Sequence, residues 1–250
     1  MDKVISRKER SHVNTTFSSK IVLVAGGTGG LGKAVTLSFL HEGASVIATY
    51  IIKEEADALR DAVGSSAHLE LLPLDATDET ACRALVDGIT ARYGRLDILV
   101  NTIGGYAGGR ALWETDAKIW RLMFNLNVNA GYALAHAAVP AMLKQKNGCI
   151  VNVAAKAAFD HAAGAAAYAA SKSAALAMMD CLAQDLKGTG VRVNSVLPSI
   201  IDTEPNRRAM PDADFSKWPK PEEIARVILF LCSDEAKLIH GGAIPVYGQM

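Results

Sequence analysis

The stretch Ile21-Val-Leu-Val-Ala-Gly-Gly-Thr-Gly-Gly-Leu-Gly32 decides the fold, because an apolar segment runs directly into a glycine-rich loop that opens a helix. Glycine accepts positive φ and lets the backbone approach a pyrophosphate, whose charge the free N–H groups at a helix start stabilise. With a strand before it and a helix after it, the loop predicts dinucleotide binding, and a simple tight turn is the alternative. Two spacings fit: Gly27, Gly29 and Gly32, or Gly26, Gly30 and Gly32.

The rest of the chain alternates short apolar runs with longer helical stretches, which is typical of β-α units around a parallel sheet. The predicted strands are 21–25, 45–50, 68–72, 97–100, 149–153, 191–197 and 243–246. The predicted helices are 31–42, 78–93, 127–145 and 165–187. We therefore expect an α/β fold, a single Rossmann-type domain with a doubly wound parallel sheet of about seven strands and helices on both faces.

Two segments differ from this pattern. Residues 1–19 are polar and charged, so we expect a mobile N-terminal tail ahead of one catalytic domain over residues 20–250. Between residues 199 and 220, Pro205, Pro211 and Pro219 interrupt any regular period. We expect a long irregular loop or a broken helix there, and we assign it to the substrate because long loops are usually functional.

The composition limits the partners. Of the 250 residues, 50% are hydrophobic, enough for one large core. Lysine plus arginine and aspartate plus glutamate each total 26, so no net charge draws the chain to nucleic acid or a membrane. The four cysteines form no C-x-x-C pair, which argues against a metal site. No apolar run reaches the roughly 18 residues of a membrane helix. We expect a cytoplasmic protein with a small-molecule substrate.

The end of the second predicted strand bears on the choice between NAD(H) and NADP(H). A carboxylate about twenty residues after the glycine loop would accept hydrogen bonds from the adenosine ribose. The strand ends at Thr49-Tyr50 without one, which favours NADP(H) and leaves NAD(H) open. Thr49 or Lys53 could contact a 2′-phosphate, although a solvated Lys53 is the alternative. Asp75, beside Ala76, is a candidate for the adenine edge or else a loop residue or helix cap.

A candidate reaction centre is Tyr168-Ala-Ala-Ser-Lys172, whose spacing places a phenol and an ammonium on one face of a helix. Hydride addition to a carbonyl carbon must be matched by a proton on oxygen, and a tyrosine with a pKa of about 10 is a poor base at neutral pH. A nearby cation would favour phenolate. In isolation such a pair is more often a surface contact.

Further motifs follow in a consistent order. They are Asn101-Thr-Ile-Gly104 after the fourth strand, Asn127 within Asn-Leu-Asn-Val-Asn, and Pro198 after Val-Asn-Ser-Val-Leu. With the glycine loop and the Tyr168/Lys172 pair, they resemble the short-chain dehydrogenase/reductase family over residues 20–250. The resemblance selects the spacing of Gly26, Gly30 and Gly32, and it implies a nicotinamide dinucleotide cofactor and a homo-oligomer, either a dimer or a homotetramer.

The family implies roles for the matching residues. Lys172 would hold the nicotinamide ribose and lower the pKa of Tyr168, Tyr168 would be the general acid or base, and Asn127 would support a water-linked proton relay. Asn127 is preferred to its neighbouring asparagines because of its spacing from Trp120 and Pro140. The expected cofactor contacts are Gly26, Thr28, Gly29, Gly30, Leu31, Gly32, Tyr50, Asp75, Ala76, Asn101, Ile103, Gly104, Lys172, Pro198, Ile200, Ile201 and Thr203.

One position departs from the family pattern. A hydroxyl that polarises the substrate carbonyl should lie thirteen residues before the tyrosine, and that residue is Ala155. Its absence removes a donor worth a few kcal/mol on a carbonyl substrate. Either the substrate does not need the donor or another group replaces it. Lys156 is the candidate for such a group, with a surface lysine as the alternative.

A narrower resemblance, to the dihydropteridine reductases within this family, points to a substrate. It covers residues 104–109 with Tyr106, the pair Ala155 and Lys156, and a run from residue 196 to Trp218. A quinonoid pterin presents a conjugated imine that accepts hydride without serine-type polarisation. We therefore expect Ala155, Lys156 and Tyr106 to lie near the substrate. One difference separates this chain from the dihydropteridine reductases: Tyr50 stands where they carry the acidic residue that accompanies their NADH preference.

The sequence thus predicts an NAD(P)(H)-dependent oxidoreductase that transfers hydride to or from a small carbonyl or imine, with a pterin-like compound as one candidate. The alternative is a cofactor-binding regulator or scaffold that kept the fold and lost turnover, as Ala155 would permit. Retention of Asn127, Tyr168 and Lys172 favours the enzyme. The substrate and the direction of hydride transfer remain open, and the alanine-rich faces of the two longest predicted helices predict self-association.

Overall fold

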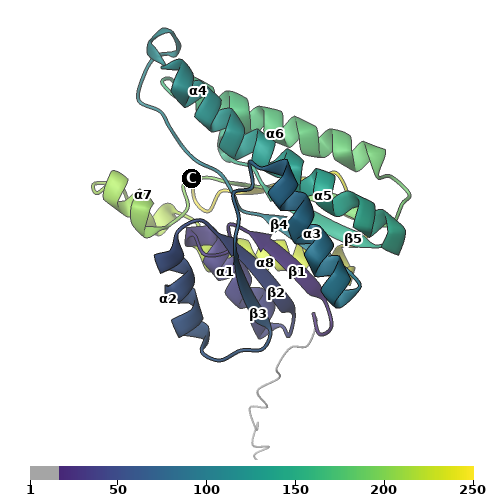
Figure 1. Cartoon of the computed structure of the whole chain (residues 1–250). Coiled ribbons are helices and arrows are strands. Elements are labelled where there is room, and N and C mark those ends of the chain that lie inside the picture. The colour runs from purple at the N-terminus through teal and green to yellow at the C-terminus, as the bar shows by residue number, and fades with distance from the viewer. Residues whose placement is uncertain (1–16) are drawn as a thin grey trace, which may run out of the picture.

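The computed structural model describes residues 17–250 (Figure 1). Its strands are β1 (Ile21–Ala25), β2 (Ser45–Tyr50), β3 (Leu69–Pro73), β4 (Ile98–Asn101), β5 (Gly148–Val153), β6 (Val191–Pro198) and β7 (Ala243–Val246). All pair in parallel, in the order β3-β2-β1-β4-β5-β6-β7. The chain reverses its direction of travel across the sheet between β1 and β4, and ligands of doubly wound sheets bind at that point. The predicted fold class is confirmed.

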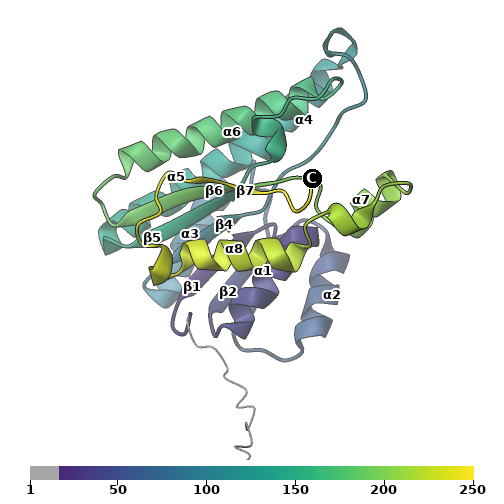
Figure 2. The ribbon, with the colours of Figure 1, turned by 180° about the vertical axis from the view of Figure 1, so that it is seen from behind.

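Helices cover both faces of the sheet. They are α1 (Gly30–His41), α2 (Lys53–Val63), α3 (Glu79–Tyr93), α4 (Ala117–Phe124), α5 (Ala130–Gln145), α6 (Ala166–Asp185), α7 (Glu204–Ala209) and α8 (Pro221–Cys232). Helices α1 and α8 pack together on one face, best seen in Figure 2, whereas α3 and α5 pack together on the face toward the viewer in Figure 1. The strands are therefore buried on both sides, which explains their continuous apolar runs.

The alternation of side chains along β1 separates two cores. Leu23 belongs to the core beneath α3, α5 and α6, whereas Val22 and Val24 belong to the core beneath α1 and α8. Neighbouring residues of a strand point to opposite faces, so one short strand contributes to both cores. The end of β1 is thereby held rigidly where the glycine loop begins.

The N-terminal boundary lies earlier than predicted. The expected mobile tail falls, for residues 1–16, outside the described part of the chain. Phe17, however, is only 3% exposed, and its ring packs edge-on against Phe39 with 5.0 Å between centroids. Its N–H donates to the Glu42 carbonyl at 3.1 Å. The packed domain therefore includes Phe17, three residues ahead of the predicted boundary at residue 20, because this ring completes the core beneath α1.

The predicted irregular segment 199–220 contains two short helical pieces. Helix α7 begins at Glu204 and carries Pro205 in its first turn, where proline costs no hydrogen bond. A 3-10 turn over Phe215–Lys217 follows, with Asp214 accepting the Ser216 N–H at 3.1 Å. Pro205 thus lies at a helix start, whereas Pro211 and Pro219 lie between helical pieces, and the segment is a broken helix rather than a structureless loop.

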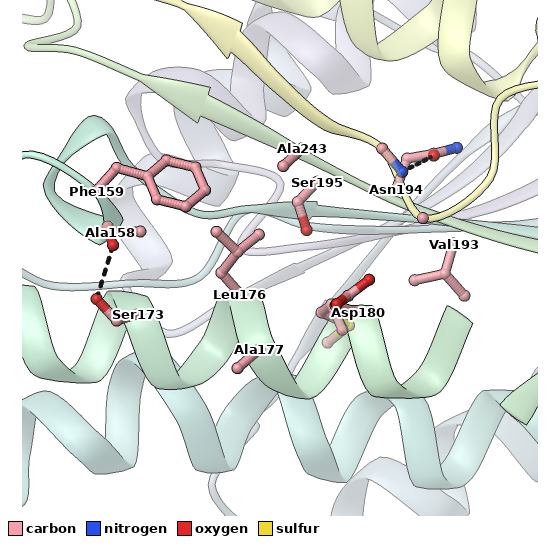
Figure 3. A pocket seen from close by; sticks show the side chains of 13 residues that line it. Ala158, Phe159, Ser173, Leu176, Ala177, Asp180, Val193, Asn194, Ser195 and Ala243 are labelled. Carbon is pink, nitrogen blue, oxygen red and sulfur yellow. Dashed lines mark hydrogen bonds between the residues drawn. The ribbon is translucent and has the colours of Figure 1, made fainter. Parts of the chain in front are cut away.

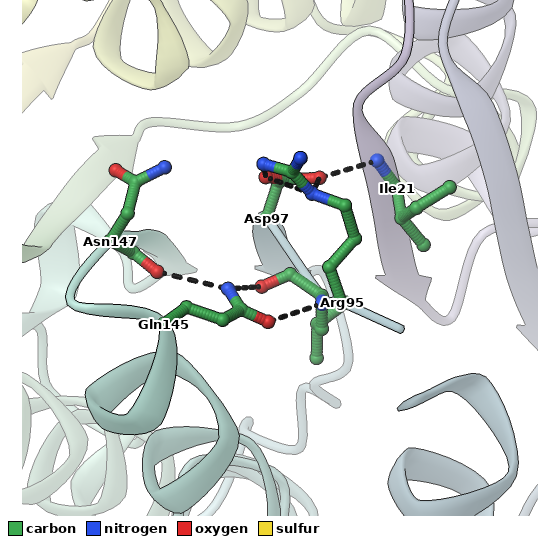
Figure 4. A network of polar contacts seen from close by, with 6 residues as sticks. Ile21, Arg95, Asp97, Gln145 and Asn147 are labelled. Atoms are coloured by element: carbon green, nitrogen blue, oxygen red, sulfur yellow. Dashed lines mark hydrogen bonds and ion pairs between the residues drawn. The ribbon is translucent and has the colours of Figure 1, made fainter. Parts of the chain in front are cut away.

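A polar network ties the amino ends of the strands together, opposite the glycine loop (Figure 4). The Asp97 carboxylate is 2% exposed, accepts the Ile21 N–H at 2.8 Å and receives the Arg95 guanidinium, whose Nε lies 2.9 Å from Oδ2. Gln145 at the end of α5 donates to the Leu96 carbonyl at 2.9 Å and accepts the Leu96 N–H at 2.8 Å. The network joins β1, β4 and α5.

Asp97→Ala is expected to lower the free energy of unfolding by about 3 kcal/mol, because it leaves the buried Ile21 N–H without a partner and the Arg95 guanidinium unpaired. Urea unfolding followed by circular dichroism measures the change. Asp87→Ala, on the exposed face of α3, is the matched control. A loss below about 1 kcal/mol at Asp97 would mean that the network adds little to stability.

Candidate active site

The glycine loop forms the turn that its sequence predicts. Gly26 adopts φ +73° and donates its N–H to the Thr49 hydroxyl at 3.0 Å. At Gly32 a Cβ atom would lie 2.0 Å from the Gly26 carbonyl oxygen, so only glycine lets α1 approach the turn this closely. Within the described residues, the N-cap Gly29 supplies no side-chain hydrogen bond to the first turn of α1. The N–H groups of the first turn of α1 are left for a ligand, and the turn fits a pyrophosphate.

The segment after β4 packs against this loop. The Thr102 hydroxyl donates to the carbonyls of Ala25 at 2.8 Å and of Gly26 at 3.1 Å. Asn101 accepts the Ile103 N–H at 3.1 Å and donates to Asn152 on β5 at 2.9 Å. The carboxyl ends of β1, β4 and β5 are therefore cross-linked by side chains, which fixes the floor of the predicted cofactor site.

Asn127 occupies a π-helical turn, Asn125–Asn129, that joins α4 to α5. It is 3% exposed, accepts the Gly105 N–H at 2.9 Å and donates to the Gly105 carbonyl at 3.1 Å. Its amide also donates to the Ser171 hydroxyl at 2.9 Å, and that hydroxyl donates to the Tyr168 carbonyl at 2.8 Å. The side chain of Asn127 thus fixes both the 104–105 segment and α6, and its part in a water-linked relay stays a prediction.

Tyr168 and Lys172 lie on the first turns of α6, beside this segment. Lys172 is 6% exposed, and its ammonium donates to the Val153 carbonyl at the end of β5 at 3.1 Å. A Cβ atom at Gly104 would lie 2.9 Å from both the Lys172 Nζ and the Asn127 Oδ1. The structure therefore brings together the three residues that were predicted to be catalytic.

The protonation of this pair differs from the expectation. Burial, and to a lesser extent the neighbouring Tyr106 phenol, raises the pKa of Tyr168 to about 12. Burial lowers the pKa of Lys172 to about 8. Lys172 does not lower the Tyr168 pKa as expected, because its ammonium is directed to the Val153 carbonyl and desolvation of the phenol dominates. The Tyr168 phenol therefore keeps its proton at neutral pH, and its role as the general acid stays a prediction.

Of the three predicted substrate contacts, Tyr106 lies against Tyr168, and Ala155 and Lys156 follow the end of β5. Ala155 is buried at the end of β5. Lys156 lies beside it, with its ammonium 3.2 Å from Asp160 Oδ2 and 5.5 Å from the centroid of the Tyr247 ring. Tyr106 packs its ring edge-on against Tyr168, with 4.9 Å between centroids and an interplanar angle of 76°. The Lys156 ammonium is thus paired with Asp160, whereas the Tyr106 ring contacts Tyr168, the predicted general acid.

The region after β2 corrects one expectation. Thr49 is buried and its hydroxyl already accepts the Gly26 N–H, so it is not free to contact a 2′-phosphate. Lys53 is exposed and pairs with Asp57 at 2.5 Å. The Thr28 hydroxyl in the glycine loop donates to Glu55 on α2 at 3.0 Å. Of the two candidates for contact with a 2′-phosphate, Thr49 and Lys53, only Lys53 is accessible to a ligand.

Asp75 is held by its own loop. Its carboxylate accepts the Thr77 hydroxyl at 2.7 Å and the Thr77 N–H at 2.9 Å. These side-chain and backbone hydrogen bonds lower the pKa of Asp75. The loop-residue alternative therefore describes its present contacts, and contact with an adenine edge stays a prediction.

The last predicted group lies over the glycine loop from the β6 side. A Cβ atom at Gly30 would lie 2.8 Å from Thr203 Cγ2, so Thr203 covers the start of α1. The Ser199 hydroxyl donates to the Tyr247 carbonyl at 2.7 Å, which ties the segment after β6 to the C-terminal residues. Thr203 therefore lies against the glycine loop, and contact of residues 198–203 with the cofactor stays a prediction.

Comparison with known proteins agrees with this arrangement. The family model described as short chain dehydrogenase matches residues 20–214. The chain belongs to the short-chain dehydrogenase/reductase family. Family membership makes the chain an oxidoreductase with a nicotinamide cofactor.

Several relatives within the short-chain dehydrogenase/reductase family resemble the chain over nearly its whole length. The 3-oxoacyl-acyl-carrier-protein reductase FabG of Thermotoga maritima is 35% identical over 243 residues, 94% of this chain and 98% of that protein. The meso-2,3-butanediol dehydrogenase of Serratia marcescens is 32% identical over 93% of this chain and 94% of that enzyme. Among solved structures, ElxO with NADP bound is 27% identical with a TM-score of 0.86, covering 92% of this chain and 97% of that one.

Other parts of the described chain are separate from the site. Across residues 17–250, no helix is both long and apolar enough to cross a membrane, and no three His, Cys, Asp or Glu side chains gather as metal ligands. A hollow of about 430 Å³ lies between α6 and the β6–β7 edge, lined by Phe159, Leu176 and Asp180 among others (Figure 3). It does not include Asn127, Tyr168 or Lys172.

Three polar residues of the site were not predicted. Ser171 lies inside the Tyr168-Ala-Ala-Ser-Lys172 motif, and a hydroxyl directly before the lysine is a sequence feature that could have indicated it. Glu55 on α2 gives no sequence signal, because its contact with Thr28 depends on how α2 packs. Asn152 is 2% exposed, and its Nδ2 has no partner among the described residues. Asn152 is therefore a further polar group at the floor of the site.

Proposed function

We propose that the protein reduces a small, conjugated carbonyl or imine compound, with a quinonoid dihydropterin as the model substrate and NADP(H) as the preferred cofactor. The observation that carries this proposal is the half-buried, protonated Tyr168 one helical turn from Lys172, at a site where Ala155 replaces the usual hydroxyl. In a conjugated substrate the charge left by reduction spreads over several atoms, so a hydrogen-bond donor to it can lie elsewhere than at the position of Ala155.

The chain supplies recognisable groups for the cofactor. The free N–H groups at the start of α1 would hold the pyrophosphate, and Lys172 would hold the nicotinamide ribose. When bound, the nicotinamide ring supplies or accepts the hydride. NADP(H) is supported by the missing carboxylate at the end of β2, by the exposed Lys53, and by the solved relative with NADP bound. Glu55, which holds Thr28, opposes a 2′-phosphate.

The residues of the chain perform the proton chemistry. The Tyr168 phenol donates its proton to the oxygen or nitrogen next to the reduced carbon, because burial keeps that proton on the phenol at neutral pH. The Lys172 ammonium, carried by the same helix face, stabilises the phenolate that results. Ser171 and Asn127 hold the Tyr168 backbone and the 104–105 segment in register.

We further propose that the protein is a cytoplasmic homo-oligomer. Support comes from apolar side chains exposed on neighbouring helices, namely Trp120 and Leu122 on α4 and Tyr132 and Leu143 on α5. Covering these four side chains with a second copy of the chain would remove apolar surface from water. Sedimentation at micromolar concentration would detect a dimer or tetramer, and a monomer would contradict the proposal.

Fluorescence titration with NADPH and NADH, followed by turnover on ketones, aldehydes and a quinonoid dihydropterin, tests the function. We expect about tenfold tighter binding of NADPH, reduced toward parity by Lys53→Ala, since that change removes the cation nearest the predicted 2′-phosphate position. We also expect the conjugated substrates to react faster than simple ketones. Tight binding of either cofactor with no oxidation across the panel would instead favour a regulator or scaffold.

A further inference from the structure

The missing hydroxyl at Ala155 leaves one question at the site: which group, besides Tyr168, meets the charge that develops on the substrate. Two candidate side chains near Tyr168 can donate a hydrogen bond and are not buried, Lys156 and Tyr106. Lys156 is turned to the rim, where Asp160 Oδ2 lies 3.2 Å from its ammonium. Tyr106 is different, because its ring contacts the Tyr168 ring directly.

The loop that carries Tyr106 is shaped around its phenol. A Cβ atom at Gly108 would lie 2.4 Å from the Tyr106 hydroxyl oxygen and 2.9 Å from Cζ, so any side chain there would collide with the phenol. The next residue, Gly109, donates its N–H to the Gly164 carbonyl at 2.9 Å, which pins the loop to the chain just ahead of α6. The Tyr106 phenol thus lies over Gly108, on a loop that is tied to the chain just ahead of the helix that bears Tyr168.

The Tyr106 hydroxyl is available to a ligand. Its side chain remains 69% exposed, and no residue between 17 and 250 hydrogen-bonds to its oxygen. It is also electrostatically close to the proposed acid, because after burial the Tyr106 phenol is the second cause that raises the pKa of Tyr168. A neutral phenol with a free O–H is a suitable donor to developing negative charge.

We propose that Tyr106 is a catalytic residue whose hydroxyl donates a hydrogen bond to the substrate and so replaces the hydroxyl that Ala155 lacks. This inference rests on the proposed function, and it assigns the second donor to the loop after β4 instead of the end of β5. The two phenols then meet the substrate from one side, Tyr168 as the proton donor and Tyr106 as the hydrogen-bond donor.

Tyr106→Phe tests the proposal, because it keeps the ring that packs on Tyr168 and removes only the hydroxyl. We expect kcat to fall about 100-fold, as on removal of one oxyanion donor, with the Kd for NADPH unchanged. The added change Ala155→Ser in the same chain should restore at least about tenfold of that loss, since a serine there returns a donor to the family position. Tyr93→Phe, which removes a phenol remote from the site, is the matched control and should keep wild-type kcat.

Wild-type kcat in Tyr106→Phe would overturn the proposal, as would a loss that Ala155→Ser leaves unrepaired. A loss in Lys156→Met with none in Tyr106→Phe would assign the donor to Lys156 instead. All variants are compared on a substrate that the wild-type protein reduces. If the wild-type protein binds NADPH but reduces nothing, the proposed function itself has failed, which is a distinct result.

Discussion

Tyr168→Phe is expected to lower kcat by about 1,000-fold, because the variant keeps the ring in α6 but has no proton for the reduced substrate. The Kd for NADPH should change by less than about twofold, since the ring still fills its place against Tyr106. Loss of NADPH absorbance measures kcat, and fluorescence titration measures Kd. The remote Tyr93→Phe variant controls for the change of residue type.

Activity within a few-fold of the wild-type value in Tyr168→Phe would sink the proton-donor role. A large loss of NADPH affinity would instead mean that the phenol serves mainly in cofactor binding. The two parameters together therefore separate a chemical role from a binding role at this position.

Lys172→Met should remove turnover and yet stabilise the fold at neutral pH. Burial lowers the pKa of Lys172 to about 8 in the folded protein, against 10.5 when it is unperturbed. Between these values the unfolded chain binds the proton and the folded one does not, so the free energy of unfolding rises with pH; below about 8 the folded state carries the full cost of a buried charge. Methionine removes that cost.

The expected gain is about 2 kcal/mol at neutral pH, after allowance for the lost hydrogen bond to the Val153 carbonyl. The gain should shrink as the pH rises from about 8 toward 10.5, where the wild-type lysine becomes neutral in both states. Urea unfolding at several pH values measures it, with Lys144→Met on the exposed face of α5 as the control. A variant that is less stable than the wild type at neutral pH would show that the buried charge is not costly.

Much of the fold was predictable because a parallel sheet buries both faces of its strands. All seven predicted strands occur, and β7 has the predicted bounds 243–246. The four predicted helices correspond to α1, α3, α5 and α6. The join of α4 to α5 through a π-helical turn was not predictable, because Asn-Leu-Asn-Val-Asn contains no glycine or proline to mark an irregular helix.

The site was predictable where its residues lie in motifs and not where they meet across the fold. Gly26, Asn127, Tyr168 and Lys172 carried recognisable spacing, and the structure brings the last three together. The contact of Tyr106 with Tyr168 joins separate segments, and its geometry depends on the loop around Gly108. Burial also reversed the expected direction of the Tyr168 pKa, since the sequence reveals the lysine but not the desolvation.

The central claim is that this chain reduces a small substrate by hydride transfer, and transfer of a labelled hydride tests it most directly. The wild-type protein is incubated with NADPH deuterated on the transferred position and with the panel of conjugated carbonyl and imine compounds, and the products are examined by mass spectrometry. We predict one deuterium in the reduced product for each NADPH consumed, and about 1,000-fold slower formation of that product with Tyr168→Phe. Saturable NADPH binding with no deuterium in any product would contradict the account.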